Sequence, residues 1–240
     1  MSSLEEAIEA IHEHPPRTVA VLTGAGVSAD SGIPTFRGAG GLWRNYRASD
    51  LATPEAFERD PALVWEWYEW RRGLIREARP NAAHEAIARL GDACVITQNV
   101  DGLHARAGSR RIVELHGNIF RVRCTREGTR TMREHSFAEI PPRCACGALL
   151  RPDVVWFGEA LSNDDLADAS AAVHGADLVL IVGTSGVVYP AAGLVHLAKG
   201  LTIEINPEMS DLSPAVRCAI QMRAADAVPR IVAAIEEARA

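Results

Sequence analysis

The sequence has no excess of basic residues, no long apolar run and no signal-like start. Its 240 residues carry a net charge of -6, whereas binding to nucleic-acid phosphates needs a clustered excess of Lys and Arg. No apolar stretch reaches the roughly 18 to 20 residues that a membrane-spanning helix needs, and the N-terminal residues are acidic and amphipathic. These absences predict a cytoplasmic protein that binds neither nucleic acid nor membranes, and we expect a monomer.

Cysteine is also scarce, and its pattern does not suggest a disulfide framework. The chain has five cysteines in 240 residues, and an odd number of thiols cannot all be paired. Three of them, Cys124, Cys144 and Cys146, gather in one region, where a metal site is the question to ask. We interpret Cys94 and Cys218 as packing residues.

Hydrophobic residues make up 48% of the chain, which is enough for a full core. The opening residues 2–6, SSLEE, resemble a capping box and predict an N-terminal helix that ends before Pro15 and Pro16. Short apolar runs, typical of strands buried on both faces, alternate mostly with helical patterns such as 81–90 and 191–199. This alternation predicts an α/β fold, a Rossmann-like doubly wound parallel sheet with its site at the carboxyl ends of the strands. The runs are 18–23, 93–97, 154–157, 178–182 and 201–205.

Two segments interrupt the alternation. Residues 38–79 contain a tryptophan-rich helical stretch, 61–76, and predict an inserted helical module. Residues 121–151 are polar, hold the three clustered cysteines and predict a small zinc-ribbon-like lobe, in which we expect the arginines of 121–126 to form a solvated face. The expected organisation is one domain, 1–240, with its core in 1–37, 80–120 and 152–240.

Glycines and polar residues follow several predicted strands. The glycine-rich loop 24–29 has the form of a dinucleotide phosphate loop, although such a loop alone is a weak signal. Residues 98–101, 183–185 and 206–208 also follow strands, or lie where a strand should end. Amides there can bind a carboxamide, and carboxylates can bind ribose hydroxyls. Together these residues predict one pocket.

His116 is the most interesting of the eight histidines, because it precedes Gly117 just before the polar lobe. An imidazole titrates near neutral pH and can accept a proton from a sugar hydroxyl. By contrast, we expect solvated positions for His12, His14, His135 and His174, and packing or capping roles for His84, His104 and His196.

Five sequence blocks together resemble the sirtuin family. They are GAGVSADSGIPTFR at 24–37, TQNVDGLH at 97–104, ELHG at 114–117, RPDVVWFGE at 151–159 and VGTSGVVYP at 182–190. The resemblance spans residues 20 to 208 in the family's order. It implies an NAD-dependent protein lysine deacylase that consumes NAD as a co-substrate.

The resemblance also implies a mechanism and a set of catalytic residues, His116, Asn99 and Asp101. The acyl oxygen of the modified lysine attacks the ribose anomeric carbon as nicotinamide leaves. His116 then acts as general base on a ribose hydroxyl, which attacks the resulting imidate. The products are deacylated lysine, nicotinamide and acyl-ADP-ribose.

The same likeness assigns residues to the two ligands. NAD contacts are implied for Gly24, Ala25, Gly26, Ala29, Phe36, Arg37, Trp43, Gln98, Asn99, Val100, Asp101, Gly183, Thr184, Ser185, Asn206, Pro207, Glu208 and Ala224. Contacts with the acylated protein or peptide are implied for Val154, Trp156, Phe157, Gly158, Glu159, Val187, Val188 and Tyr189, with the peptide added as an extra strand.

Tyr68 and Arg71 resemble the Tyr-x-x-Arg pair of the bacterial class III branch of sirtuins, which recognises the carboxylate of succinyl- or malonyl-lysine. Three residues apart on a helix, the two side chains lie on neighbouring faces. A guanidinium binds a carboxylate with two hydrogen bonds and a phenol adds one. We therefore expect desuccinylase and demalonylase activity beside deacetylase activity.

The zinc pattern of many sirtuins is incomplete here. The family uses two Cys-x-x-Cys pairs, but Glu127 stands where the partner of Cys124 should be, and Cys144 and Cys146 form a shortened pair. A structural zinc site needs four donors. Either Glu127 or His135 completes the site, or the lobe folds without metal.

Other functions fit parts of the sequence. The glycine loop alone would suit an NAD-dependent oxidoreductase, although the long insertion falls where an acidic ribose-binding residue normally follows. The same pocket would suit a mono-ADP-ribosyltransferase or a non-catalytic NAD or ADP-ribose sensor. Peptide-dependent nicotinamide release separates these alternatives from a deacylase.

Overall fold

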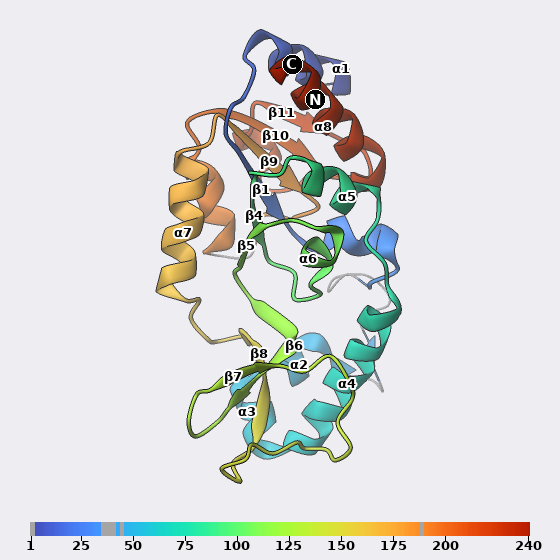
Figure 1. Ribbon diagram of the computed structural model, residues 1–240, viewed down its shortest axis with the longest axis vertical. Helices are drawn as coiled ribbons and strands as arrows, with labels where there is room; N and C mark the ends of the chain where they lie inside the picture. Colours follow the sequence, from blue (N-terminus) through green and yellow to red (C-terminus); the bar gives the residue numbers. More distant parts are fainter. Residues whose placement is uncertain (1–2, 35–41, 44–45, 188–189) are drawn as a thin grey trace.

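The computed structural model describes residues 3–34, 42–43, 46–187 and 190–240. Figure 1 shows an elongated molecule with two parts, a parallel sheet with its helices at one end and a smaller assembly of helices α2 to α4 with strands β6 to β8 at the other.

The large part is built on a six-stranded, all-parallel sheet in the order β11-β10-β9-β1-β4-β5. The strand order reverses between β1 and β9, as in a doubly wound sheet, which confirms the predicted fold class. Two of the strands, β5 and β11, had no clear apolar run in the sequence. The strands are β1 (Val19–Thr23), β4 (Cys94–Thr97), β5 (Arg111–Glu114), β9 (Leu178–Val182), β10 (Leu201–Ile205) and β11 (Cys218–Ile220).

Helices cover both faces of this sheet because its strands are apolar on both sides. Val19 and Val21 pack against α1 (Leu4–Glu13), α5 (Ala82–Arg89) and α8 (Ala224–Arg239). Ala20 and Leu22, which alternate with them, pack toward α7 (Asn163–His174) and the 3₁₀ helix η2 (Ala191–Leu197). The predicted capping box begins α1, with the Glu6 N–H donating to the Ser3 hydroxyl over 3.0 Å. Shorter elements are η1 (Ala25–Ser31), α6 (Leu103–Ala107) and η3 (Ser213–Ala215).

The small part combines segments that are far apart in sequence. An antiparallel sheet, ordered β7-β6-β8, shares one apolar core with α4, in which Trp65, Val122 and Trp156 are buried. The helical module and the cysteine-bearing segment are therefore packed against each other. The elements are β2 (Leu42–Trp43), β3 (Tyr46–Arg47), α2 (Ala48–Leu51), α3 (Pro54–Arg59), α4 (Pro61–Glu77), β6 (Gly117–Cys124), β7 (Arg130–Met132) and β8 (Leu150–Val154).

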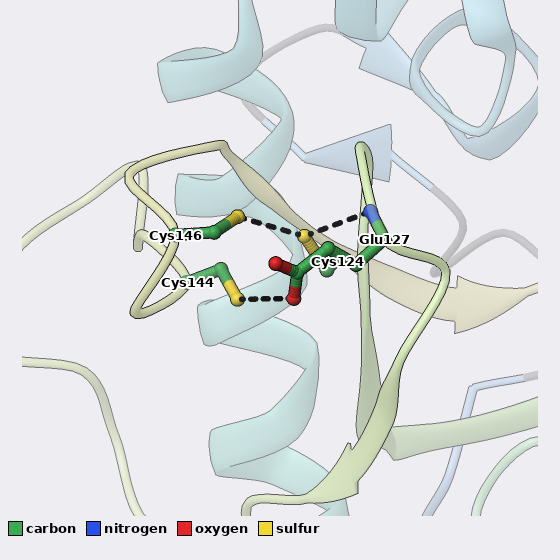
Figure 2. A group of neighbouring side chains, drawn as sticks. All are labelled: Cys124, Glu127, Cys144 and Cys146. Carbon is green, nitrogen blue, oxygen red and sulfur yellow. Dashed lines mark hydrogen bonds between the residues drawn. The ribbon is translucent and has the colours of Figure 1, made fainter.

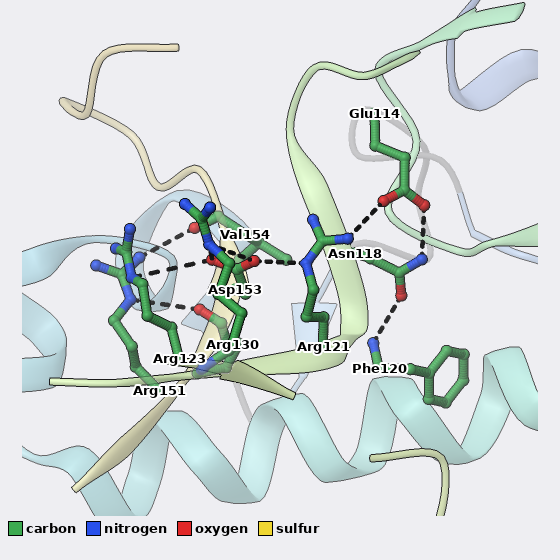
Figure 3. A network of polar contacts seen from close by, with 10 residues as sticks. Glu114, Asn118, Phe120, Arg121, Arg123, Arg130, Arg151, Asp153 and Val154 are labelled. Carbon is green, nitrogen blue, oxygen red and sulfur yellow. Dashed lines mark hydrogen bonds and ion pairs between the residues drawn. The ribbon is translucent and has the colours of Figure 1, made fainter. Parts of the chain in front are cut away.

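Two local predictions were wrong. The run 154–157 is not a strand of the main sheet, because only Val154 is in a strand and that strand, β8, pairs with β6. The solvated face expected for 121–126 fails for Arg121 and Arg123, whose guanidinium groups lie 2.5 and 3.9 Å from the buried carboxylate of Asp153 (Figure 3). The segment 121–126 contains no acid of its own, and the acid that pairs with its arginines, Asp153, comes from β8.

Among the residues that the structure describes, each helix is too short or too polar to cross a membrane.

Candidate active site

The candidate active site begins where β1 and β9 end side by side. The Gly24 N–H donates to the Val182 carbonyl over 3.0 Å, and the Gly26 N–H donates to the Gly183 carbonyl over 2.8 Å. A Cβ atom on Gly26 would lie 2.7 Å from the Gly183 Cα atom, so no larger residue fits without a backbone shift. This contact forms the floor of a crevice at the switch point of the sheet, where doubly wound folds bind nucleotides.

The crevice widens into a cleft of about 1400 Å³ that is lined by both parts of the molecule. Its volume exceeds the 300 to roughly 1,000 Å³ of a site for one small ligand, so it has room for two. Most of the residues proposed from the sequence line it: Gly24, Ala25, Gly26, Ala29, Tyr68, Arg71, Gln98, Asn99, Val100, His116, Val154, Trp156, Phe157, Gly158, Glu159, Gly183, Thr184, Ser185, Val187, Asn206, Pro207, Glu208 and Ala224.

One proposed residue, Asp101, lies elsewhere. Asp101 is buried behind the lining, where its carboxylate accepts from the Ser28 hydroxyl over 2.7 Å and from the Leu103 N–H over 2.9 Å. Burial raises the pKa of Asp101. Trp43 belongs to β2. The remaining four, Phe36, Arg37, Val188 and Tyr189, are outside the described residues.

Hydrogen bonds tie the polar strand ends to one another. The Gln98 amide donates to the Thr184 hydroxyl over 3.1 Å, and the Asn206 amide donates to the Thr184 carbonyl over 2.8 Å. On the other side, the Asn99 amide donates to the Gly24 carbonyl over 3.1 Å. These contacts join the ends of β1, β4, β9 and β10 into one polar wall.

His116 lies in this wall, and one of its ring nitrogens is engaged in a hydrogen bond. Its Nδ1 atom is 2.9 Å from the Gln98 carbonyl oxygen, which only accepts hydrogen bonds. Nδ1 must therefore carry the proton in the neutral ring, which leaves the Nε2 lone pair available. Burial lowers the pKa of His116, although the bond to Gln98 opposes that shift. The ring is thus a neutral base at pH 7.

Two further histidines, His84 and His104, are buried behind the cleft, in the packing and capping roles that we expected, whereas His196, for which we expected the same, is exposed. His84 accepts from the Asn81 N–H at the start of α5 over 3.3 Å. The Nε2 atom of His104 lies 3.1 Å from the Thr23 hydroxyl. Burial lowers the pKa of His84 to about 4 and the pKa of His104 to about 3, so both rings stay neutral.

The opposite wall of the cleft comes from α4 and the segment after β8. Tyr68 is buried, and its hydroxyl accepts from the indole N–H of Trp156 over 2.8 Å. Arg71, one turn along α4, has its guanidinium 5.3 Å from the centre of the Trp67 ring. Burial raises the pKa of Tyr68 and lowers the pKa of Arg71, and each group acts electrostatically on the other. The predicted pair therefore lies together at the cleft.

The sequence did not point to several residues that also line the cleft, including Asp30, Trp67 and Arg223. Asp30 and Arg223 form an ion pair between η1 and the start of α8, although 193 positions separate them in the chain. No local pattern marks such a pair. Trp67 stands beside Tyr68, so the tryptophan-rich stretch was the one signal that could have identified it.

The three clustered cysteines meet one carboxylate (Figure 2). The ligand atoms of Cys124, Glu127, Cys144 and Cys146 all lie within 4.8 Å of one another, and the Cys124 and Cys146 sulfur atoms are 3.5 Å apart. Donors around a tetrahedral zinc ion are about 3.8 Å apart for Zn–S bonds of 2.3 Å. The four residues therefore fit a zinc ion. His135 is not part of this group and is exposed, so Glu127 is the fourth donor that the structure offers.

The fold and the cleft define a dinucleotide-binding protein of the Rossmann-like type, with a second ligand-binding wall facing the nucleotide crevice. Comparison with known proteins narrows this class. Residues 24–190 match the Sir2 family.

The chain is 53% identical over 224 residues to an NAD-dependent protein deacylase of Pyrobaculum aerophilum, with 90% of each chain covered. It is 49% identical over 238 residues to an NAD-dependent protein deacylase of Thermus thermophilus, covering 94% of this chain and 92% of the relative.

Solved structures agree. A Sir2 homologue in complex with NAD superposes with a TM-score of 0.90 at 44% identity, over 98% of this chain and 95% of the other. A Sir2 protein bound to an acetylated peptide gives a TM-score of 0.83 at 30% identity, over 96% of this chain and 98% of the other. The chain belongs to the Sir2 family, the sirtuins.

Proposed function

We propose that this protein is an NAD-dependent protein lysine deacylase. It transfers the acyl group from lysine to ADP-ribose and releases nicotinamide. The observation that carries the proposal is a single cleft in which a glycine-lined nucleotide crevice, an imidazole with a free Nε2 atom and a second ligand-binding wall meet.

The residues have distinct parts in this reaction. The amide oxygen of the acylated lysine displaces nicotinamide at the ribose anomeric carbon, next to Asn99 and Gln98. His116 then takes a proton on Nε2 from a ribose hydroxyl, which becomes the nucleophile for the acyl carbon. Asp101 acts from behind the wall, because its carboxylate holds the Ser28 hydroxyl and Ser28 in turn accepts from the Asn99 amide over 3.1 Å.

Nicotinamide release tests this function. An acyl-lysine peptide should trigger it, and His116→Ala should abolish deacylation while nicotinamide exchange partly survives, because exchange does not need the base. His196→Ala is the matched control, since His196 is exposed and does not line the cleft. Undiminished deacylation in His116→Ala would remove the assigned base, and reduced-cofactor absorbance without nicotinamide release would indicate an oxidoreductase.

We further propose that Tyr68 and Arg71 accept an acidic acyl group, succinyl or malonyl, beside acetyl. A cation and a neutral phenol in a largely buried wall suit a carboxylate. Arg71→Met should lower desuccinylation far more than deacetylation. Arg76→Met makes the same change on the same helix outside the cleft lining and should spare the ratio of the two rates. Equal losses of both activities in Arg71→Met would remove the carboxylate argument.

We propose that zinc binds Cys124, Cys144 and Cys146 with Glu127 as fourth ligand, in a structural role remote from the reaction. Metal analysis of the purified chain should give about one zinc per chain. Glu127→Ala should lose zinc to a chelator faster, whereas Glu127→Cys should retain it more tightly and His135→Ala should match the wild type. Zinc loss in His135→Ala but not in Glu127→Ala would reverse the assignment.

We also propose that residues 1–240 form one catalytic domain, with the core, helical and cysteine-bearing segments expected from the sequence. We propose that the protein is a monomer in the cytoplasm, where thiols stay reduced, and that it binds neither nucleic acid nor membranes. Acylated proteins or peptides are the macromolecular substrates.

A further inference from the structure

The hydroxyl of Tyr68 is held by a group that can act only as a donor. The indole N–H of Trp156 donates to the Tyr68 oxygen over 2.8 Å, and both side chains are 3% exposed. An indole has no acceptor, so the phenol oxygen must accept in this bond. The phenol proton therefore lies on the other side of the oxygen and is available to a second partner.

Trp156 itself is held firmly. The Arg151 guanidinium stacks 3.4 Å from the centre of the Trp156 ring, and the Phe57 ring lies 5.3 Å from it. Glu159 accepts from both Arg151 terminal nitrogens, at 2.6 and 2.9 Å, and from the Trp156 N–H of the backbone at 2.8 Å. Side chain and backbone are thus both constrained, and the direction of the indole N–H is defined before any ligand binds.

The wall that α4 contributes to the cleft then offers two hydrogen-bond donors. Tyr68 and Arg71 both line the cleft, and burial keeps the phenol neutral and able to donate. A carboxylate beside them would accept from the phenol and from the guanidinium. An acetyl group ends in a methyl group and gains nothing from either donor.

We propose that Trp156 is a positioning residue for acyl specificity: its indole N–H fixes the Tyr68 hydroxyl as a donor toward the acyl pocket and so favours acidic acyl groups. The inference rests on the proposed succinyl and malonyl activity. Phenylalanine at this position would retain the ring and lose the N–H, and the hydroxyl would then turn freely between its two in-plane orientations.

The test compares variants by one ratio, kcat/KM for a succinyl-lysine peptide divided by kcat/KM for the acetyl-lysine peptide of the same sequence. Trp156→Phe should lower this ratio about fivefold, as expected for one oriented hydrogen bond. Tyr68→Phe should lower it about tenfold or more, since it removes the donor to a charged group. In the Tyr68→Phe background, Trp156→Phe should change the ratio no further.

Trp65→Phe is the matched control. Trp65 lies on α4 with Tyr68 and belongs to the same core as Trp156. Its N–H donates to the Leu150 carbonyl over 2.8 Å, outside the cleft lining. It should leave the ratio unchanged even if both rates fall. If Trp156→Phe unfolds, benzothienylalanine at position 156 keeps the bicyclic shape and replaces only the N–H with sulfur.

The outcomes separate the two proposals. The role of Trp156 is overturned if Tyr68→Phe and Arg71→Met lower the ratio below the wild-type value but Trp156→Phe, or its benzothienylalanine counterpart, does not. The acidic acyl pocket is supported in that case. A ratio that none of these variants changes overturns the acidic acyl pocket itself. If no acyl-lysine peptide triggers nicotinamide release from NAD in the wild type, the proposed deacylase activity is overturned.

Discussion

The two parts of the molecule are stabilised by different kinds of side chain. The apolar clusters on the two faces of the parallel sheet contain aliphatic residues and cysteine, with no Trp, Tyr or Phe among the described residues. The core of the small part combines aliphatic and aromatic residues, and six of its described aromatic residues are buried: Phe57, Trp65, Trp67, Tyr68, Phe120 and Trp156.

The small part also contains a buried arginine and a buried acid that several arginines share. Arg72 is fully buried in the small part between the rings of Phe120 and Phe137, at 5.4 and 5.1 Å. Asp153, also buried, has Arg121, Arg123 and Arg130 around it, and Arg121 continues to Glu114 at 3.0 Å (Figure 3). The apolar faces of the sheet are thus stabilised by non-directional burial, and the small part adds directional contacts between long side chains to its apolar core.

The largest effect that should separate the two parts comes from Asp153→Asn. Removing the carboxylate leaves the half-buried Arg123 without its acid and Arg121 with Glu114 alone. This should cost about 3 kcal/mol of unfolding free energy, the lower end for a broken buried pair, because the arginines are only half-buried. Asp92→Asn is the control in the sheet part, because its pair with Arg239 is exposed and 3.7 Å long, and should cost at most about 1 kcal/mol. Urea denaturation measures both, and equal losses would erase the contrast.

Adding a single methyl group at Gly26 tests how tightly the sheet part is packed at the nucleotide crevice. Gly26→Ala places a Cβ atom 2.7 Å from the Gly183 Cα atom and 2.8 Å from its carbonyl oxygen. Backbone must move at the nucleotide crevice, so we expect a destabilisation of about 1–3 kcal/mol and weaker NAD binding by calorimetry. Wild-type NAD affinity in this variant would show that the crevice tolerates the shift.

Lower pH should destabilise the sheet part through His84 and His104. Their pKa values of about 4 and about 3 lie below the unfolded value of 6.5, so the unfolded state binds more protons between these limits. Stability is complete above pH 6.5 and is lost as the pH falls, by about 2 kcal/mol per histidine at pH 5. Denaturation at pH 7 and pH 5 measures the loss, and His84→Gln should reduce it. The exposed His14→Gln should not.

The smallest expected effect is a gain in stability from a substitution in the small part. Gly73 lies inside α4, and a Cβ atom there meets nothing within 4 Å. Gly73→Ala should therefore stabilise the protein by about 0.5–1 kcal/mol, the difference in helix propensity. Thermal unfolding would measure the gain. A loss instead would mean that α4 needs the glycine, and the comparison with Gly26 would no longer hold.

The parts of the fold that local patterns predicted are those where burial is complete on both faces. Strands β1, β4 and β9 appear in the sequence as near-continuous apolar runs, because helices cover both sides of them. The strand β5 lies at the edge of the sheet, where only Val113 of its four residues is buried, and it has no such run. The apolar run 154–157 misled because it leaves β8 and lines the cleft instead.

The residues of the candidate site were likewise only partly predictable from the sequence. The polar residues after β1, β4, β9 and β10 were predictable, since parallel strands end at one edge of the sheet. By contrast, the position of Asp101 behind the wall depends on its bonds to Ser28 and Leu103. The bond from Trp156 to Tyr68 joins residues 88 positions apart, and no spacing rule could anticipate it.

The amino-acid sequence by itself determined the doubly wound sheet, its nucleotide crevice and the identity of the chemical groups at the strand ends. Hydrophobic periodicity and glycine positions are local properties, and burial of apolar runs follows from them. Only the tertiary structure decided which carboxylate joins the three cysteines, which acid the arginines share and which donor fixes Tyr68. Those contacts form between distant segments, and their strength depends on distance and desolvation that arise only when the chain has packed.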